Sequence, residues 1–267
     1  MLMAKKKTGT AKTVSKPYLT GRPTDRRTLK QALRFAGMLI IMSILYLMAG
    51  AFAPPAAVVR VVINAAVLVL VYLLFWNFGV STGTEDVTTG ETLYMRREHQ
   101  TVVTAEEEAT CFHRLKGFIP PLLGTVPIFL CALVLAFIAQ KVMYGVGPLP
   151  SWISNLSSRS EIYEPLAFYT EAHPLTLETV LRFLVRICLM PFVSMIGAEN
   201  TGAMLTLERV SPLLVLLPAL VHGIGYLRGP SVRSRMHSSI AANNRKRARR
   251  EKKQRELRLK PKQEHLN

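Results

Sequence analysis

Two arginines stand four residues apart in a stretch that is apolar enough to cross a membrane, ETVLRFLVRICLMPFVS at residues 178–194. Glu178, Arg182 and Arg186 recur every four residues, so their side chains share one stripe of a helix. Charges in apolar helices often mark binding sites, and two arginines could hold the phosphate or carboxylate of a substrate or lipid head group. The commoner alternative is an amphipathic helix whose arginines reach water beside Glu178.

Three further groups of residues could carry chemistry. His222, in LVHGIGYLRG, could transfer a proton, although a histidine that hydrogen-bonds a neighbouring carbonyl is far commoner. Glu199 is a second polar candidate close to the membrane. Cys111 and His113, together with His99 and residues 106–108, include metal-ligand types, but their spacing matches no structural zinc pattern. We therefore expect no metal and no cofactor.

The last group is a basic tail, RKRARREKKQRELRLK at residues 245–260, in which ten of sixteen residues are Lys or Arg. It has too few apolar residues to insert into lipid, but each cation near an anionic leaflet contributes about 1 kcal/mol. Anionic lipid head groups are the expected partner, with RNA, a ribosome or a protein as alternatives. The absence of aromatic residues argues against base stacking. The candidate contacts are Arg245, Lys246, Arg247, Arg249, Arg250, Lys252 and Lys253.

No motif assigns a catalytic residue. The sequence has no phosphate-binding glycine loop, no GxSxG elbow and no HExxH pair. The favoured function is a non-enzymatic scaffold or accessory factor. The first alternative is a transporter or channel subunit with a polar pathway near Arg182, Arg186, Glu199 and His222, and the second is a membrane-embedded enzyme that uses Glu199, His173 or His222.

Charge and hydropathy are segregated along the 267 residues, which carry a net charge of +17 although 49% of them are hydrophobic. Residues 1–34 contain ten Lys and Arg and one acid, and residues 228–267 contain fourteen and three. Between them, thirteen acids outnumber ten bases. Because Lys and Arg accumulate on the cytoplasmic side, this pattern predicts an integral membrane protein of a bacterial plasma membrane with both termini cytoplasmic.

The predicted fold is all-α and polytopic. A basic arm at residues 1–32, disordered up to about Thr24, precedes a transmembrane domain at 33–227 and a basic tail at 228–267. Spans are expected at 33–53, 58–78, 120–140 and 210–227, each near the ~20 residues that cross a bilayer. The segment 178–197 is predicted to be an interfacial or re-entrant helix broken near Pro191, because a fifth span would put the two basic tails on opposite sides. Five spans is the alternative.

Residues 79–118 are polar and predicted to lie outside the membrane. Thr104 and Glu107 have the spacing of a capping box that begins a helix, which Phe112, Leu115 and Phe118 would continue along the membrane surface. The preceding residues 91–104 could form two short strands. Tyr226 is expected at the membrane interface. The three cysteines, Cys111, Cys131 and Cys188, are interpreted as small apolar residues without a disulfide.

Overall fold

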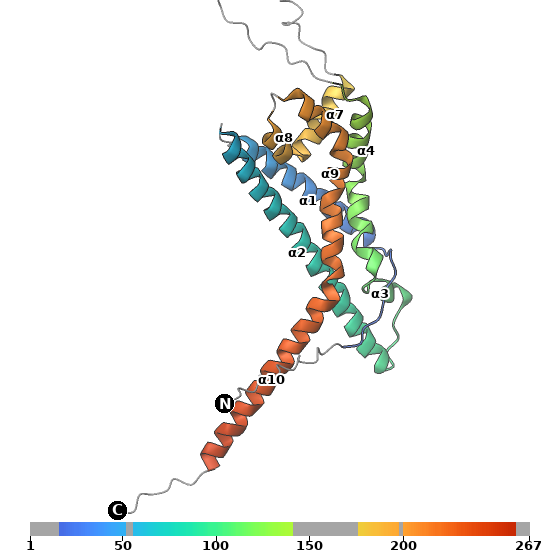
Figure 1. Ribbon diagram of the computed structural model, residues 1–267. Coiled ribbons are helices and arrows are strands. Elements are labelled where there is room, and N and C mark those ends of the chain that lie inside the picture. The colour runs from blue at the N-terminus through green and yellow to red at the C-terminus, as the bar shows by residue number, and fades with distance from the viewer. Residues whose placement is uncertain (1–15, 52–55, 141–175, 198–199, 260–267) are drawn as a thin grey trace, which may run out of the picture. The chain divides into compact units, whose positions relative to one another are not determined.

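The computed structural model describes residues 16–51, 56–140, 176–197 and 200–259. Most of these residues (84%) are helical, and the described chain contains no strand. Within these described ranges, four helices are long and apolar enough to cross a membrane, which confirms the all-α polytopic fold (Figure 1). They are α1 (Thr28–Ala51), α2 (Ala57–Glu98), α4 (Ile119–Ile138) and α9 (Thr201–Leu227).

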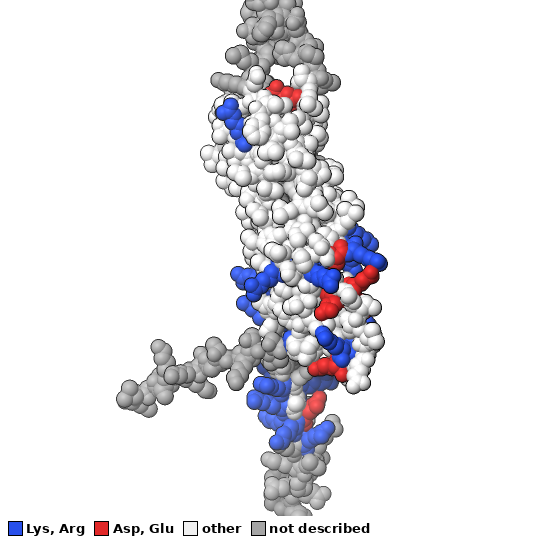
Figure 2. Space-filling model, turned by 90° about the vertical axis from the view of Figure 1, so that its right-hand side faces the viewer, with Lys and Arg blue, Asp and Glu red and all other residues white. Residues whose placement is uncertain are grey.

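The chain divides into two compact units. The apolar unit comprises residues 28–74 and 120–220, and the polar unit comprises residues 1–27, 75–119 and 221–267. Helices α2 and α9 therefore both begin in the apolar unit and end in the polar unit. Figure 2 shows Lys and Arg side chains gathered over the polar unit and a broad, largely uncharged face on the apolar unit.

Many large apolar side chains of α1 and α2 are exposed, among them Ile40, Ile41, Ile44, Val58, Val62 and Leu70. Such a surface would associate in water, whereas hydrocarbon solvates it and requires only that backbone groups pair within each helix. The exposed face of the apolar unit is therefore a lipid-facing surface.

Helix α2 extends well beyond its predicted end at residue 78. Its 42 residues give a length of about 63 Å, roughly twice the ~30 Å thickness of the hydrocarbon core. The added segment is rich in threonines, and four of their hydroxyls donate to the carbonyl four residues earlier, as Thr88 does to Thr84 at 2.8 Å. Because residues 91–98 belong to this helix, the prediction of a strand there is wrong.

Two glycines of α2 allow α9 to approach closely within the polar unit. A Cβ atom at Gly79 would overlap the carbonyl oxygen of His222, and one at Gly83 would overlap that of Tyr226. The spacing of four residues places both on one face, as in the GxxxG pattern of packed membrane helices. On α9, Gly225 has a similar close contact with the backbone of Trp76.

The connection from α2 to α4 confirms the capping box but not the predicted continuous helix. Thr104 accepts a hydrogen bond from the Glu107 amide, and the Glu107 carboxylate accepts one from Thr104, at the start of α3 (Ala105–Ala109). Those bonds hold the pKa of Glu107 below its ordinary value. Helix α3 then stops, and a separate 3-10 turn, η1 (Arg114–Gly117), leads into α4.

The segment around Arg182 and Arg186 forms two helices, α7 (Leu177–Cys188) and α8 (Met190–Ile196), bent by 94° at Leu189. Pro191 occupies the first turn of α8, where a missing amide donor costs nothing. The predicted break is thus confirmed, and a pair so bent is either a re-entrant segment or a broken span.

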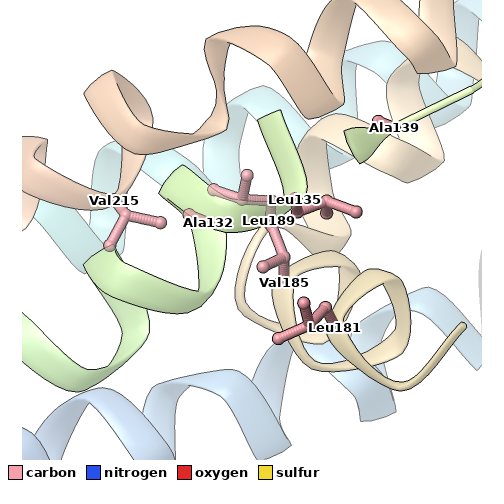
Figure 3. Close-up of a cluster of buried hydrophobic side chains, with 7 residues drawn as sticks. All are labelled: Ala132, Leu135, Ala139, Leu181, Val185, Leu189 and Val215. Carbon is pink, nitrogen blue, oxygen red and sulfur yellow. The ribbon is translucent and has the colours of Figure 1, made fainter. Parts of the chain in front are cut away.

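One face of α7 packs into the core of the apolar unit. Leu181, Val185 and Leu189, spaced by four residues, are buried in a cluster with residues of α4 and α9 (Figure 3). The cluster contains Ala132, Leu135, Ala139 and Val215 besides these three residues. This packing confirms the amphipathic character expected for the segment.

Helix α9 begins nine residues before the predicted span at 210–227. Glu208 and Arg209, which directly precede the predicted span, both lie within α9. A buried carboxylate can occupy a membrane helix when its charge is paired, and Glu208 is paired with arginines. Helix α10 (Gly229–Leu259) follows α9 and carries most of the basic tail.

Candidate functional site

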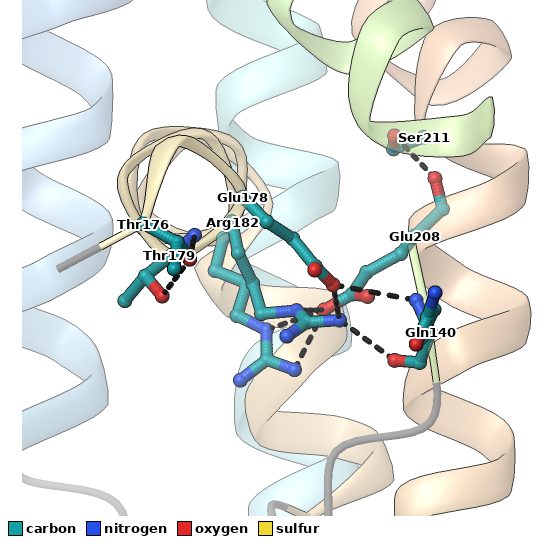
Figure 4. Close-up of polar contacts among 8 residues, drawn as sticks. Gln140, Thr176, Glu178, Thr179, Arg182, Glu208 and Ser211 are labelled. Carbon is teal, nitrogen blue, oxygen red and sulfur yellow. Dashed lines mark hydrogen bonds and ion pairs between the residues drawn. The ribbon is translucent and has the colours of Figure 1, made fainter. Parts of the chain in front are cut away.

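Arg182 and Arg186 share one partner, Glu208 of α9. Figure 4 shows Arg182 between Glu208 and Glu178. The Nε atom of Arg182 donates to Glu208 Oε1 at 2.8 Å, and the Nε and Nη2 atoms of Arg186 donate to the same oxygen at 2.9 and 2.6 Å. Glu208 is 2% exposed, whereas the two arginine side chains are 13% and 22% exposed. The arginines therefore hold a carboxylate, and this carboxylate belongs to the protein.

Glu178 completes this group, which we call the Glu208 network: Glu178, Arg182, Arg186 and Glu208. Arg182 Nη2 lies 2.8 Å from Glu178 Oε1 and donates to the carbonyl of Gln140, also at 2.8 Å. The Gln140 amide in turn donates to Glu178. Two acids and two bases balance in charge, and together they tie α7 to α9 and to the chain just after α4.

Asn64, a strongly polar residue in the second span, also has a partner in the apolar unit. Its side-chain amide donates to the Ser194 hydroxyl of α8 at 3.0 Å and to the Arg60 carbonyl at 2.8 Å. The Nε atom of Arg60 is buried and has no hydrogen-bond partner among the described residues. Asn64 thus connects α2 to the second helix of the bent pair.

His222 lies in the polar unit and is 4% exposed. Its Nδ1 atom is 3.1 Å from the carbonyl of Gly117, and its ring lies 5.3 Å from that of Phe78. Two alternatives were considered for His222, proton transfer and a hydrogen bond to a neighbouring carbonyl. The observed contact with a carbonyl is the second and commoner arrangement. Glu199 and His173 lie outside the described residues.

A second ion network, centred on Lys116 and not predicted from the sequence, lies in the polar unit. We call it the Lys116 network: Asp25, Asp86, Lys116 and Tyr226. The Lys116 Nζ atom lies 2.9 Å from Asp25 Oδ2 and 3.3 Å from Asp86 Oδ2, and it donates to the Thr110 carbonyl at 2.7 Å. The Tyr226 hydroxyl donates to Asp86 at 2.7 Å.

Aromatic and thiol side chains enclose the Lys116 network. The Phe112 ring stacks on that of Tyr226 at 5.1 Å, and the Tyr18 ring meets Phe112 edge-on at 6.3 Å. Cys111 is fully buried beside them, and burial raises the pKa of its thiol to about 11. A protonated thiol of this kind is a poor nucleophile. The surroundings of Cys111 are therefore those of a structural cysteine and not of a reactive one.

The Lys116 network orders part of the N-terminal arm. Two backbone amides of the arm donate to the body of the unit, Leu19 to the Gly90 carbonyl and Gly21 to the Phe112 carbonyl. Residues 16–24 are therefore ordered, and the prediction of disorder up to about Thr24 is wrong for them. The fifteen residues before them lie outside the described residues. Tyr226, which was predicted to lie at the membrane interface, is buried against Phe112, so its ring does not face lipid.

The base of α10 is fixed to α2 by Glu91. Arg233 donates to Glu91 Oε2 from Nε at 3.0 Å and from Nη2 at 2.9 Å, and His237 Nε2 is 2.7 Å from Glu91 Oε1. A carboxylate that engages both partners fixes the direction of the helix as well as its position. The basic half of α10 thus leaves the unit from a defined point.

Beyond that point the side chains of α10 lie in the open. Every side chain from Ala242 to Arg255 is exposed, including all seven candidate contacts. One ion pair, Arg247 with Glu251 at 3.1 Å, offsets a single charge. The structure adds to the charge pattern that this segment is helical and that its base is fixed on α2.

The predicted and observed groups differ in how the sequence encodes them. Arg182 and Arg186 are one helical turn apart, so their shared stripe was visible from spacing, although Glu208 was not recognised as their partner. Asp25, Asp86 and Lys116 are separated by 61 and 30 residues. The available signal was that Asp25 is the single acid among the first 34 residues.

The described residues contain no group of three or more His, Cys, Asp or Glu side chains that could hold a metal ion. His113 instead begins η1, where its Nδ1 atom accepts from the Leu115 amide at 3.3 Å. Comparisons with protein-family models, with curated proteins and with solved structures found no match for this chain.

Proposed function

We propose that this chain is a multi-pass membrane scaffold that presents a basic helix, α10, to an anionic lipid surface. The observation that carries the proposal is the exposure of fourteen consecutive residues, 242–255, eight of them basic and one acidic. A helix with cations around its whole circumference cannot bury an apolar face, so its attraction to a partner is electrostatic.

The strength of this attraction is sufficient for a tethered helix. If half of the eight cations face a flat anionic leaflet, each contributes about 1 kcal/mol, or about 4 kcal/mol in total. The membrane domain already holds the helix near a bilayer, so the attachment is intramolecular and needs less affinity than free association. RNA is the less favoured partner because residues 229–259 contain no Phe, Tyr or Trp to stack on bases.

Both basic flanks, in this proposal, lie on the cytoplasmic side of a bacterial plasma membrane. Support comes from contacts within the polar unit, where the N-terminal arm, the end of α2 and α10 are joined by Leu19–Gly90 and Arg233–Glu91 hydrogen bonds. With four spans and this shared side, α7 and α8 form a re-entrant segment. The positive-inside rule then gives the cytoplasmic assignment.

Binding of the full-length protein to added vesicles tests the partner. The protein is held in nanodiscs of neutral phosphatidylcholine and mixed with vesicles with or without anionic phosphatidylglycerol. We expect binding to the anionic vesicles alone, and release as salt rises and the Debye length falls from ~10 Å at 0.1 M to ~3 Å at 1 M. Replacement of the seven candidate cations by Gln should abolish it.

A scrambled order of residues 242–255 is the matched control, because it preserves charge and composition. It should bind as the native protein does, since the attraction to a flat anionic surface depends on the number of charges and not on the order of the residues. Binding to neutral vesicles, or tighter binding to RNA than to anionic vesicles at equal salt, would overturn the proposal.

Cysteine labelling from each side of sealed vesicles tests the topology in a cysteine-free background. Single cysteines introduced by Ser239→Cys and Thr20→Cys should react from the same side, and one introduced by Ser157→Cys from the other. Labelling of the first two variants from opposite sides would require the bent pair to be a fifth span.

A further inference from the structure

The apolar unit contains a cavity of about 360 Å³ between α1, α4 and α7. Its lining is apolar apart from Ser43 and the thiols of Cys131 and Cys188. Pro127, inside α4, is part of the wall. We propose that this cavity binds one acyl chain of a bilayer phospholipid, with the head group left outside.

The position of the cavity favours an occupant from the bilayer. Two of its walls, α1 and α4, are helices apolar and long enough to span the membrane. Its lining includes side chains that are about half exposed: Ile40 at 57%, Ile44 at 53% and Leu184 at 47%. These side chains belong to the lipid-facing surface, so the cavity opens towards the acyl chains of the bilayer.

The chemistry of the lining favours a hydrocarbon chain over a polar ligand. Ser43 Oγ lies 2.8 Å from the carbonyl of Leu39, so its hydroxyl is satisfied within α1. It also lies 3.5 Å from Cys188 Sγ. An apolar ligand leaves these contacts intact, whereas a polar ligand would lose its water without gaining partners.

The absence of a charged wall distinguishes a phospholipid from a free fatty acid. None of the lining residues is charged. Arg182 and Arg186, also on α7, are both engaged by Glu208 and offer no unpaired cation to a buried carboxylate. The acyl chain is therefore recognised by shape and hydrophobic contact, and binding should not depend on head-group charge.

Photo-crosslinking with a lipid probe tests this inference on the full-length protein in phosphatidylcholine vesicles. The probe is a phosphatidylcholine whose acyl chain carries a diazirine near its middle, and adducts are mapped by mass spectrometry after digestion. We expect adducts at Cys131, Ile128 and Cys188. A phosphatidylglycerol with the same chain should give the same yield at these positions.

Two variants should block the cavity from different helices, Ile44→Trp on α1 and Leu184→Trp on α7. Either one should lower adduct yield at Cys131 at least about five-fold, since a filled cavity excludes the chain. The matched control is Ile41→Trp, which changes the same residue type on α1 at 58% exposure but outside the cavity. It should leave the yield unchanged.

Three results would overturn the inference: no adducts at the cavity positions in the native protein, equal yields in the blocked and control variants, or adducts formed by the phosphatidylglycerol probe alone. Crosslinks from these positions to a second copy of the chain would also overturn it, because they would identify a dimer contact.

Discussion

The two ion networks have opposite designs. In the Lys116 network, one ammonium is shared by two carboxylates, whereas in the Glu208 network one carboxylate oxygen is shared by two guanidinium groups. The two central residues are buried alike, Lys116 at 1% and Glu208 at 2% exposure, but their partners differ: Asp25 and Asp86 are 2% and 12% exposed, and the two arginines are 13% and 22% exposed. We therefore expect the stability of the protein to depend more on Lys116 than on Glu208.

The difference follows from what each network joins. The Lys116 network connects the N-terminal arm, α2, η1 and α9, which are remote in sequence, so it contributes to the fold of the polar unit. The Glu208 network positions one amphipathic helix against its neighbours, and a long arginine can reach water if its partner is lost. A buried ion pair is costly to break because the remaining charge stays desolvated.

The largest effect is expected from Lys116→Met, which leaves Asp25 and Asp86 buried without their shared cation. Removal of one member of a buried ion pair costs about 3–5 kcal/mol. We expect this loss in the free energy of unfolding measured in detergent. The Cys111 thiol provides a second readout. Because Lys116 lowers the pKa of this thiol, loss of the cation alone should raise the pKa further, whereas opening of the network should lower it from about 11 and speed maleimide labelling at a mildly alkaline pH.

Arg26→Gln is the control for this variant. Arg26 pairs with Glu106 at 2.8 Å, but both side chains are well exposed, and such pairs contribute about 0–1 kcal/mol. Cys111 should remain as slow to label in this variant as in the native protein. Equal stability of Lys116→Met and Arg26→Gln would show that the Lys116 network is not a determinant of the fold.

A smaller effect is expected from Glu208→Gln. The substituted amide can still accept a hydrogen bond, Arg182 keeps Glu178, and the partly exposed arginines can reach water. The expected loss is about 1.5–3 kcal/mol, the contribution of hydrogen bonds to charged groups. Thermal unfolding in detergent measures it, with limited proteolysis after Arg182 and Arg186 as a test that α7 has loosened from α9. A loss as large as that of Lys116→Met would contradict the comparison.

The smallest effects are expected from lysine substitutions at the arginines, and they should be unequal. Arg182 contacts Glu208 through Nε, and it contacts both Glu178 and the Gln140 carbonyl through Nη2. One ammonium cannot reproduce two donors held apart in this way. The Nε and Nη2 atoms of Arg186 both donate to Glu208 Oε1, a single oxygen that the ammonium group of a lysine can still reach. We expect Arg182→Lys to cost about 1 kcal/mol, the scale of one net hydrogen bond, and Arg186→Lys less. The reverse order in chemical denaturation would disprove this assignment of roles.

Much of the fold was predictable because a bilayer imposes simple requirements. Apolar runs of about 20 residues had to become helices, since hydrocarbon leaves backbone groups no other partner. Local chemistry also identified the capping box at Thr104 and the break near Pro191. Each of these signals lies within a few residues of the feature that it specifies.

Helix ends were predicted less well, because charge and threonine content were interpreted as boundaries. Helix α2 continues to Glu98 because its glycines allow α9 to pack closely against it, and its threonine hydroxyls are satisfied within the helix. Helix α9 begins before Glu208 because two arginines neutralise that carboxylate. In both cases a residue of another segment changed the local preference.

The sequence by itself determined the membrane class, the number of long apolar helices, the amphipathic stripe with its arginines and the basic tail, because each is a property of neighbouring residues. Tertiary structure alone decided that Arg182 and Arg186 meet Glu208, that Asp25 joins Asp86 around Lys116, and that Glu91 fixes α10. The reason is energetic: a buried charge must find an opposite charge in three dimensions, and its distance along the chain does not limit that choice.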